Sequence, residues 1–201
     1  MSLPLILYLT ATVVPVFFSR VAAAPTWLSL QGLALCWIGL SGHEGLSAHA
    51  VLAGLEVLLV RALLVPWLLR RALGKSTQAR KSLMPSNLFA WGAAVTLIIL
   101  AFRFGDGTGG NLRALTLGVI AAIVMIAFLI LATNREPGAQ LVALLFMENV
   151  LTLFESLMPA TWPLPVHLGL SGVYILTAIV GSWLVGGHAR LGQNTISKEC
   201  P

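Results

Sequence analysis

Seven apolar stretches, each close to the length that crosses a lipid bilayer, run through this sequence. A membrane-spanning helix needs about 20 apolar residues, and lipid offers the backbone no hydrogen-bond partners, so each stretch must be helical. Only 9% of the 201 residues are charged, whereas soluble domains have roughly 25%. We therefore predict an all-α polytopic membrane helix bundle. The spans are expected at roughly 3–19, 21–41, 49–69, 87–104, 112–132, 139–158 and 166–186.

The polar segments between these stretches are short. The longest, at 70–86, has fewer than twenty residues, which is too few for a separate catalytic domain. The first basic residue, Arg20, follows the first apolar stretch instead of preceding it, so we expect an uncleaved first span and no signal peptide. We expect a single transmembrane domain over 1–201 and a non-catalytic role for this chain.

The basic residues predict the orientation of the bundle. Cytoplasmic loops of membrane proteins are enriched in Lys and Arg. With the N-terminus outside and the C-terminus in the cytoplasm, nine basic residues face the cytoplasm and two, Arg103 and Arg113, face outward. The basic residues lie between the apolar stretches, where a membrane protein needs them, and this argues against a nucleic-acid partner. The nine are Arg20, Arg70, Arg71, Lys75, Arg80, Lys81, Arg135, Arg190 and Lys198.

The sequence has no convincing metal, cofactor or disulfide motif. Cys36 and Cys200 do not form the paired spacing of a thiolate site. His43, Glu44 and His49 have the spacing H-E-x4-H, whereas zinc proteases use H-E-x-x-H to place both imidazoles on one helix face. We therefore expect neither a metal nor a cofactor.

Two glutamates lie inside the sixth apolar stretch. An ionised side chain in the middle of a span costs about 3 kcal/mol or more, so Glu148, near the centre, calls for a function. Glu155 is two helical turns later, about 10 Å along the axis, with Thr152 between them on the same face and Asn149 adjacent. This polar stripe predicts a proton relay toward the outer surface. The alternative is that these groups only form hydrogen bonds between helices.

The third stretch holds the remaining pair of ionisable residues, Glu56 and Arg61. On an α-helix a separation of five residues puts them about 140° apart, so each is expected to find its partner on another helix or subunit. Arg61 would supply a fixed positive field, or else take part in a structural interhelical ion pair. Pro66 is expected to kink this helix. His167, near the outer end of the last span, is expected to mark the membrane interface instead of a relay.

Two segments resemble a known family. Residues 133–149, which end in Met-Glu-Asn, resemble a stretch of component E of the hydrogenase-four complex that ends in Met-Glu-Asn-Gly, and residues 60–67 resemble its Lys-Val-Leu-Leu-Val-Pro segment. That family is similar, over its last portion, to the K subunit of respiratory complex I and the C subunit of multisubunit sodium/proton antiporters.

The resemblance implies that Glu148 belongs to a buried polar axis used in ion translocation, and it puts Arg61 in the place of the family's lysine. An arginine–asparagine pair of the relatives occurs here in reversed order, as Asn134 and Arg135. The glycine after Met-Glu-Asn is Val150, and Val173 stands where the relatives hold a second buried acid.

From this resemblance we expect an integral subunit of a complex I-like membrane-bound hydrogenase or related oxidoreductase, in a bacterial or archaeal cytoplasmic membrane. Its partners would be other membrane subunits, including a larger antiporter-like one. Glu148 would be the main protonation site, Arg61 and Glu56 its electrostatic partners, and Glu155 an outward relay for H⁺ or Na⁺. The alternatives are a purely structural anchor and, third, a small independent transporter.

Overall fold

The structure is a computed structural model that describes residues 2–18, 20–41, 48–74, 81–83, 88–107, 112–155, 157–158 and 164–199. Helices make up nearly all of this part, and the prediction of an all-α bundle is confirmed. The helices are α1 (Ser2–Phe18), α2 (Ala24–Ser41) after a short 3-10 turn η1 (Val21–Ala23), α3 (Ala48–Glu56), the π-helix η2 (Val57–Leu64), α4 (Val65–Leu73), α5 (Leu88–Asp106), α6 (Leu112–Thr133), α7 (Pro137–Glu155) and α8 (Leu164–Glu199).

Six apolar segments of the described part are long enough to cross a bilayer, and the shorter apolar helix Leu3–Phe18 precedes them. Because α3, η2 and α4 follow one another without a break, they form one continuous rod. The expected spans therefore coincide with the helices to within a few residues. In α8 the helix continues to Glu199, beyond its apolar segment, which ends at Gly187. The six segments are Val21–Ser41, Val51–Leu73, Leu88–Asp106, Leu112–Thr133, Pro137–Glu155 and Pro165–Gly187.

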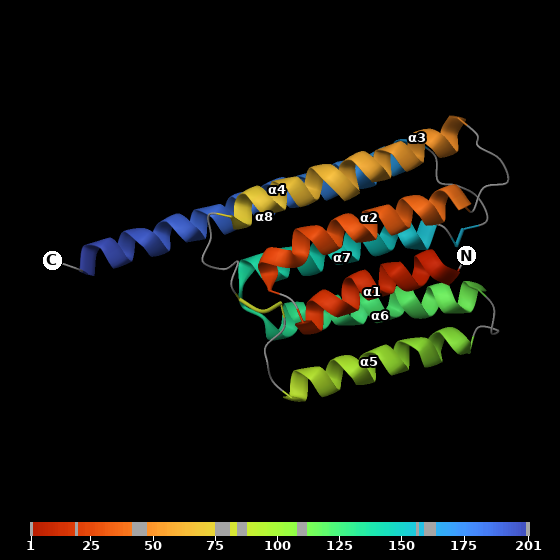
Figure 1. The fold of residues 1–201 in the computed structure, drawn as a ribbon, viewed down its shortest axis with the longest axis horizontal. Coiled ribbons are helices and arrows are strands. Elements are labelled where there is room, and N and C mark those ends of the chain that lie inside the picture. The colour runs from red at the N-terminus through yellow and green to blue at the C-terminus, as the bar shows by residue number, and fades with distance from the viewer. Residues whose placement is uncertain are drawn as a thin grey trace.

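Successive rods run in opposite directions, so the bundle has up-and-down topology (Figure 1). Helix α5 lies at one edge and packs mainly on α6, whereas α2 and α7 lie toward the middle. The α3–η2–α4 rod lies against α2 and α8. The two chain ends are at opposite ends of the bundle (Figure 1). We call the end where α1 meets α2, α4 meets α5 and α6 meets α7 the basic end.

Close backbone contacts at glycines set two of these packings. An added Cβ at Gly105 of α5 would lie 2.5 Å from the carbonyl oxygen of Ala114 on α6. One at Gly32 of α2 would lie 2.8 Å from the backbone nitrogen of Ala62 on η2. Small residues permit such close approach between membrane helices. The contact at Gly32 brings α2 directly against the part of η2 that carries Arg61.

Hydrogen bonds across loops hold the basic end together. Asn134, between α6 and α7, donates from its side-chain amide to the carbonyl oxygens of Ser82 and Leu83, at 3.3 and 3.0 Å. Lys81 forms an ion pair with Glu136. Asn134 therefore has a structural role in a turn, at the position where the family resemblance places a polar pair.

Candidate functional site

A histidine joins two glutamates from different helices near the end of the bundle opposite the basic end. The Nε2 atom of His167 on α8 lies 3.1 Å from Oε2 of Glu56 on α3, and its Nδ1 lies 3.1 Å from Oε2 of Glu155 on α7. Ser171, one turn further along α8, donates a hydrogen bond to the other oxygen of Glu56. We call these four residues the His167 cluster.

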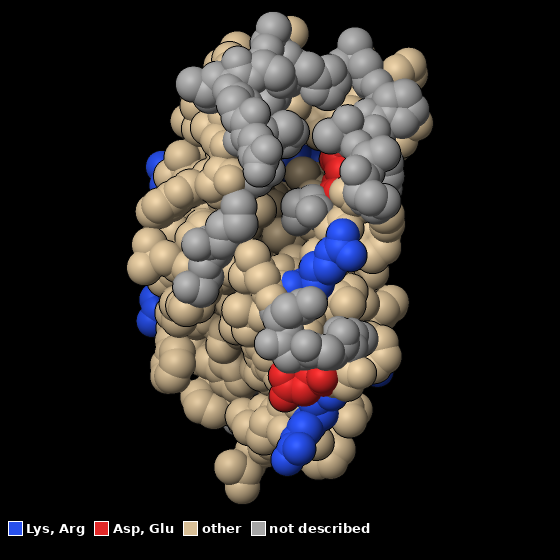
Figure 2. Space-filling model, turned by 90° about the vertical axis from the view of Figure 1, so that its right-hand side faces the viewer, with Lys and Arg blue, Asp and Glu red and all other residues tan. Residues whose placement is uncertain are grey.

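The side chains of this cluster are largely shielded, with 13 to 17% of the surface of His167, Glu56 and Glu155 exposed. Figure 2 views the molecule from this end, and among the described residues it shows acidic and basic atoms beside a hollow. A shielded imidazole with a carboxyl group on each ring nitrogen can accept a proton on one side and release one on the other.

The position of His167 differs from the sequence-based expectation. Its place near the end of the span indicated an interfacial residue, whereas the structure puts its ring between two carboxyl groups. The partners Glu56 and His167 are 111 residues apart in the chain. Only the packing of α8 against α7 and the α3–η2–α4 rod brings them together, and no local sequence pattern encodes that contact.

The expected angle of about 140° between Glu56 and Arg61 is wrong, because the helix between them is not an α-helix. Residues 57–64 form a π-helix, in which hydrogen bonds join residues five apart. This geometry turns Arg61 toward the side of the rod that carries Glu56. The backbone N–H of Val65 donates to the carbonyl oxygen of Val60, and Pro66, which has no N–H to donate, follows at once.

Arg61 is the centre of a second group, deep in the bundle, with only 2% of its surface exposed. Its Nη1 atom donates to the side-chain oxygen of Asn149 at 2.9 Å and to the backbone carbonyl of Glu148 at 3.3 Å. The guanidinium lies over the ring of Tyr174, 4.5 Å from its centroid. Cation–π contact and neutral acceptors thus disperse this buried charge.

The hydrogen bonds continue from Asn149 into two further helices. Asn149 on α7 donates to the side-chain oxygen of Gln31 on α2 at 3.0 Å, and Gln31 donates to the hydroxyl of Thr12 on α1. Thr12, Gln31 and Asn149 are all fully buried. We call Thr12, Gln31, Arg61, Asn149 and Tyr174 the Arg61 network. It links α1, α2, η2, α7 and α8 through side chains alone.

The Arg61 network differs from the ion pair considered as an alternative. Among the described residues, no carboxylate oxygen lies within 4.0 Å of the guanidinium, and each ion pair involves other residues. The Nε atom of Arg61 and the hydroxyl of Tyr8 are buried without a hydrogen-bond partner in this part of the chain.

Glu148 is half-buried and points toward α8. Its Oε1 atom accepts a hydrogen bond of 3.2 Å from Thr177. Thr177 also lines a cavity of about 410 Å³ between α7 and α8, together with Gln140 and Leu144. The central acid therefore has a polar neighbour, Thr177, which itself lines a cavity. The two glutamates of α7 have different partners on α8, and Thr152, between them, is half-buried.

Several polar partners of these ionisable residues escaped the sequence analysis. Ser171, Thr177, Gln31 and Thr12 are uncharged, and a search for ionisable residues in apolar stretches passes over them. The sequence feature that could have identified them is an uncharged polar side chain inside an apolar span. Among the described residues, no three His, Cys, Asp or Glu side chains are grouped so that they could hold a metal ion. His43 and Glu44 lie outside the described residues, as does the side chain of His49.

This chain is similar to an uncharacterized protein, Rv0085, of Mycobacterium tuberculosis (strain ATCC 25618 / H37Rv). The two sequences are 29% identical over 187 residues, which cover 90% of this chain and 85% of the relative. The similarity thus extends over nearly the whole bundle. No family model matches the chain, and no solved structure matches it.

Proposed function

We propose that this chain is a non-catalytic membrane subunit of a complex I-like hydrogenase or related oxidoreductase complex, and that it contributes buried protonatable groups to ion translocation. The observation that carries this proposal is the His167 cluster, in which one imidazole meets two carboxyl groups at 3.1 Å inside a membrane bundle. The resemblance of residues 133–149 and 60–67 to component E of the hydrogenase-four complex supports the class of complex.

The His167 cluster can pass a proton without any movement of the backbone. With a neutral imidazole and two carboxylates its charge is −2, and one added proton gives an imidazolium between two carboxylates. Glu56 can deliver the proton to Nε2, and Glu155 can take the one on Nδ1. The proton would leave at Glu155, the last residue of α7. This agrees with the outward role that the sequence assigned to Glu155.

Arg61 and Glu148 would couple this step to a neighbouring subunit. Arg61 is held in place by Asn149 and Tyr174, so its positive charge is fixed in the bundle. Arg61 donates to the backbone carbonyl of Glu148 at 3.3 Å, so Glu148 would bind its proton beside a fixed positive charge, which favours the charged form of a carboxyl group. Thr177, which donates to Glu148, lines the cavity between α7 and α8, and through this contact a charge on an adjacent subunit would affect Glu148.

The test uses the whole complex, purified from its native membrane through a tag on this chain. The co-purifying subunits are identified, and redox-driven proton movement is measured in inverted membrane vesicles. Glu148→Gln and His167→Gln are compared with Glu136→Gln, which removes a carboxylate from the exposed ion pair with Lys81. Glu148→Gln and His167→Gln should both leave assembly and redox activity intact and reduce proton movement to the background leak, while the control keeps full pumping.

The other roles predict different results. If both glutamine variants pump normally while bulky substitutions on the helix surfaces break the complex, the chain is an anchor. If the purified chain alone moves ions across liposome membranes, it is an independent transporter. A partner set without any oxidoreductase subunit would overturn the assignment to a complex I-like assembly.

A further inference from the structure

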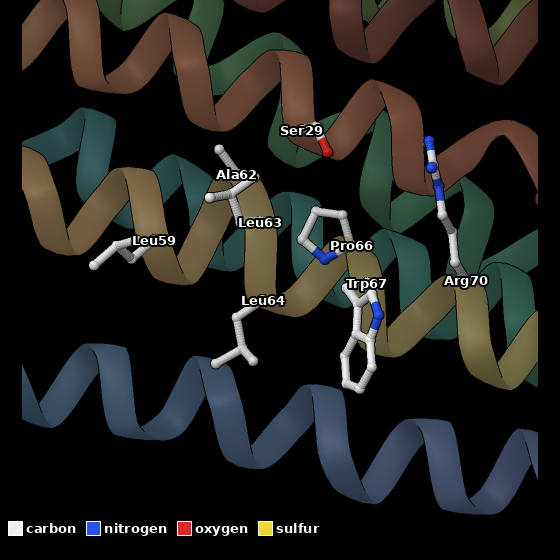
Figure 3. Close-up of a pocket in the computed structure, with 8 residues that line it drawn as sticks. All are labelled: Ser29, Leu59, Ala62, Leu63, Leu64, Pro66, Trp67 and Arg70. Carbon is white, nitrogen blue, oxygen red and sulfur yellow. The ribbon is translucent and has the colours of Figure 1, made fainter.

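A groove on the surface of the bundle runs between α2 and the rod formed by η2 and α4. Its volume is about 560 Å³, and its lining is apolar apart from Ser29 and Arg70. Figure 3 shows Arg70 extending from α4 toward α2, whereas Trp67 extends toward α8. The side chains of Leu59, Leu63 and Trp67 are about half exposed. The groove is therefore open to the lipid or to the partner subunit that surrounds the bundle.

The length of the groove corresponds to one leaflet of a bilayer. Leu59 and Arg70 are the first and last lining residues of the rod. Eleven residues of α-helix rise about 16 Å, and the π-helical part makes this span slightly shorter. The hydrocarbon core of a bilayer is about 30 Å thick. Since the apolar segment Val51–Leu73 crosses the membrane, Leu59 lies near its middle and Arg70 near its end. A single acyl chain matches this depth.

Arg70 and Trp67 line the groove where it reaches the basic end, and Arg71 lies over Trp67 on the side of the rod that faces α8. Arg70 donates to the hydroxyl of Thr26 at 3.1 Å, and the guanidinium of Arg71 lies 5.6 Å from the centroid of the Trp67 ring. Within the described residues, neither guanidinium has a carboxylate in ion-pair distance. Guanidinium groups bind phosphate through several parallel hydrogen bonds, and tryptophan is typical of the headgroup level.

We propose that this groove is a binding site for one anionic phospholipid. An acyl chain lies along Leu59, Leu63 and Trp67, the phosphate binds Arg70, and Arg71 beside Trp67 adds positive charge near the headgroup. The positive charge of these two arginines selects an anionic headgroup over a zwitterionic one, in which an attached cation already offsets the phosphate. Basic pockets between helices at the membrane surface are suited to such headgroups. The proposal is independent of the role in ion translocation.

The purified chain in detergent micelles is titrated with phosphatidylglycerol and with phosphatidylcholine of the same acyl chains, and bound lipid is counted by native mass spectrometry. We expect one phosphatidylglycerol to be retained and phosphatidylcholine to bind about tenfold more weakly. Arg70→Gln combined with Arg71→Gln should remove this preference. Arg103→Gln combined with Arg113→Gln, which deletes the same charge at the opposite end, should preserve it.

A second variant tests the groove itself without any change of charge. Leu63→Trp fills the apolar part and should weaken binding of both lipids, which also keeps the test valid if the double arginine variant does not fold. Equal binding of the two lipids would overturn the proposal. So would equal losses from the two double variants, which would mean general attraction to a basic protein. Undiminished lipid binding by Leu63→Trp would also overturn the proposal, and the groove would then be a contact for another subunit.

Discussion

Arg61 combines a permanent charge with almost complete burial, a costly combination in a membrane bundle. Breaking the contacts of a buried charge is strongly destabilising, because the charge is left without compensation. Here the compensation comes from Asn149, a backbone carbonyl and the face of Tyr174. Since Asn149 also donates to Gln31, one amide satisfies both a cation and a neutral partner. The stability of this region therefore depends on Asn149 more than on any charged pair.

Replacing Asn149 with alanine should destabilise the protein strongly. The change removes the acceptor of Arg61 and the donor of Gln31, and buried polar groups without partners cost about 1–3 kcal/mol each. We expect the free energy of unfolding to fall by about 3 kcal/mol. Chemical unfolding in mixed micelles, followed by tryptophan fluorescence, measures this value.

The matched control for this change is Thr96→Ala on α5. The Thr96 hydroxyl is exposed and donates only to Gly92 of its own helix, so its loss should alter the free energy of unfolding by less than about 0.5 kcal/mol. If the two alanine variants lost similar stability, the Arg61 network would not hold the bundle together.

The sequence identified Glu56, Arg61, Glu148 and Glu155 as buried ionisable groups, because the energy of a charge in lipid makes each of them conspicuous. It could not identify their partners. Which residue faces Glu56 depends on the rotation and depth of α8 relative to α3, and apolar packing between distant segments sets both. Glu56 and Glu155 consequently meet at His167, whereas Glu148 accepts from Thr177. The sequence had predicted that Glu148 and Glu155 form one stripe with Thr152.

At the scale of the helices, apolar length predicted the spans well, because lipid requires every backbone polar group to be satisfied within the segment. Apolar length could not predict the π-helix at Val57–Leu64. Its residues have the same apolar composition as their neighbours, and Pro66 suggested a kink. A proline clashes with the carbonyl four residues earlier. A wider turn before Pro66 relieves this conflict and also reorients Arg61.

The contact at Gly32 determines how closely α2 packs against η2. In Gly32→Ala the new methyl group would meet the backbone of Ala62 and Arg61, at 2.8 to 2.9 Å. Backbone cannot rotate away as a side chain can, so α2 must shift and Gln31 with it. We expect a loss of about 1–3 kcal/mol in the free energy of unfolding, measured by thermal melting in detergent.

Gly39→Ala on the same helix is the control. Nothing lies within 4 Å of the added Cβ there, and alanine favours a helix over glycine by up to about 1 kcal/mol, so this variant should be equal or more stable. A Gly32→Ala variant as stable as Gly39→Ala would mean that α2 and η2 do not pack closely.

For the whole molecule, the alternation of the helices puts Arg20, Arg70, Lys81 and Arg135 at the same end (Figure 1). The sequence predicted this grouping from the number of spans. The charge difference between the ends then determines which end faces the cytoplasm, and with it the direction of any proton movement through the His167 cluster. That cluster lies toward the less basic end, so the predicted orientation places it near the outer surface.

Single cysteines at opposite ends test this orientation. Thr133 at the end of α6 and Gly107 after α5 are both exposed and lie at opposite ends of the bundle. In a background where Cys36 and Cys200 are replaced by serine, Thr133→Cys should react with a membrane-impermeant maleimide only in inverted vesicles. Gly107→Cys should react only in right-side-out cells. The reverse pattern would turn the His167 cluster toward the cytoplasm, and Glu155 would then admit protons to the bundle instead of releasing them outward.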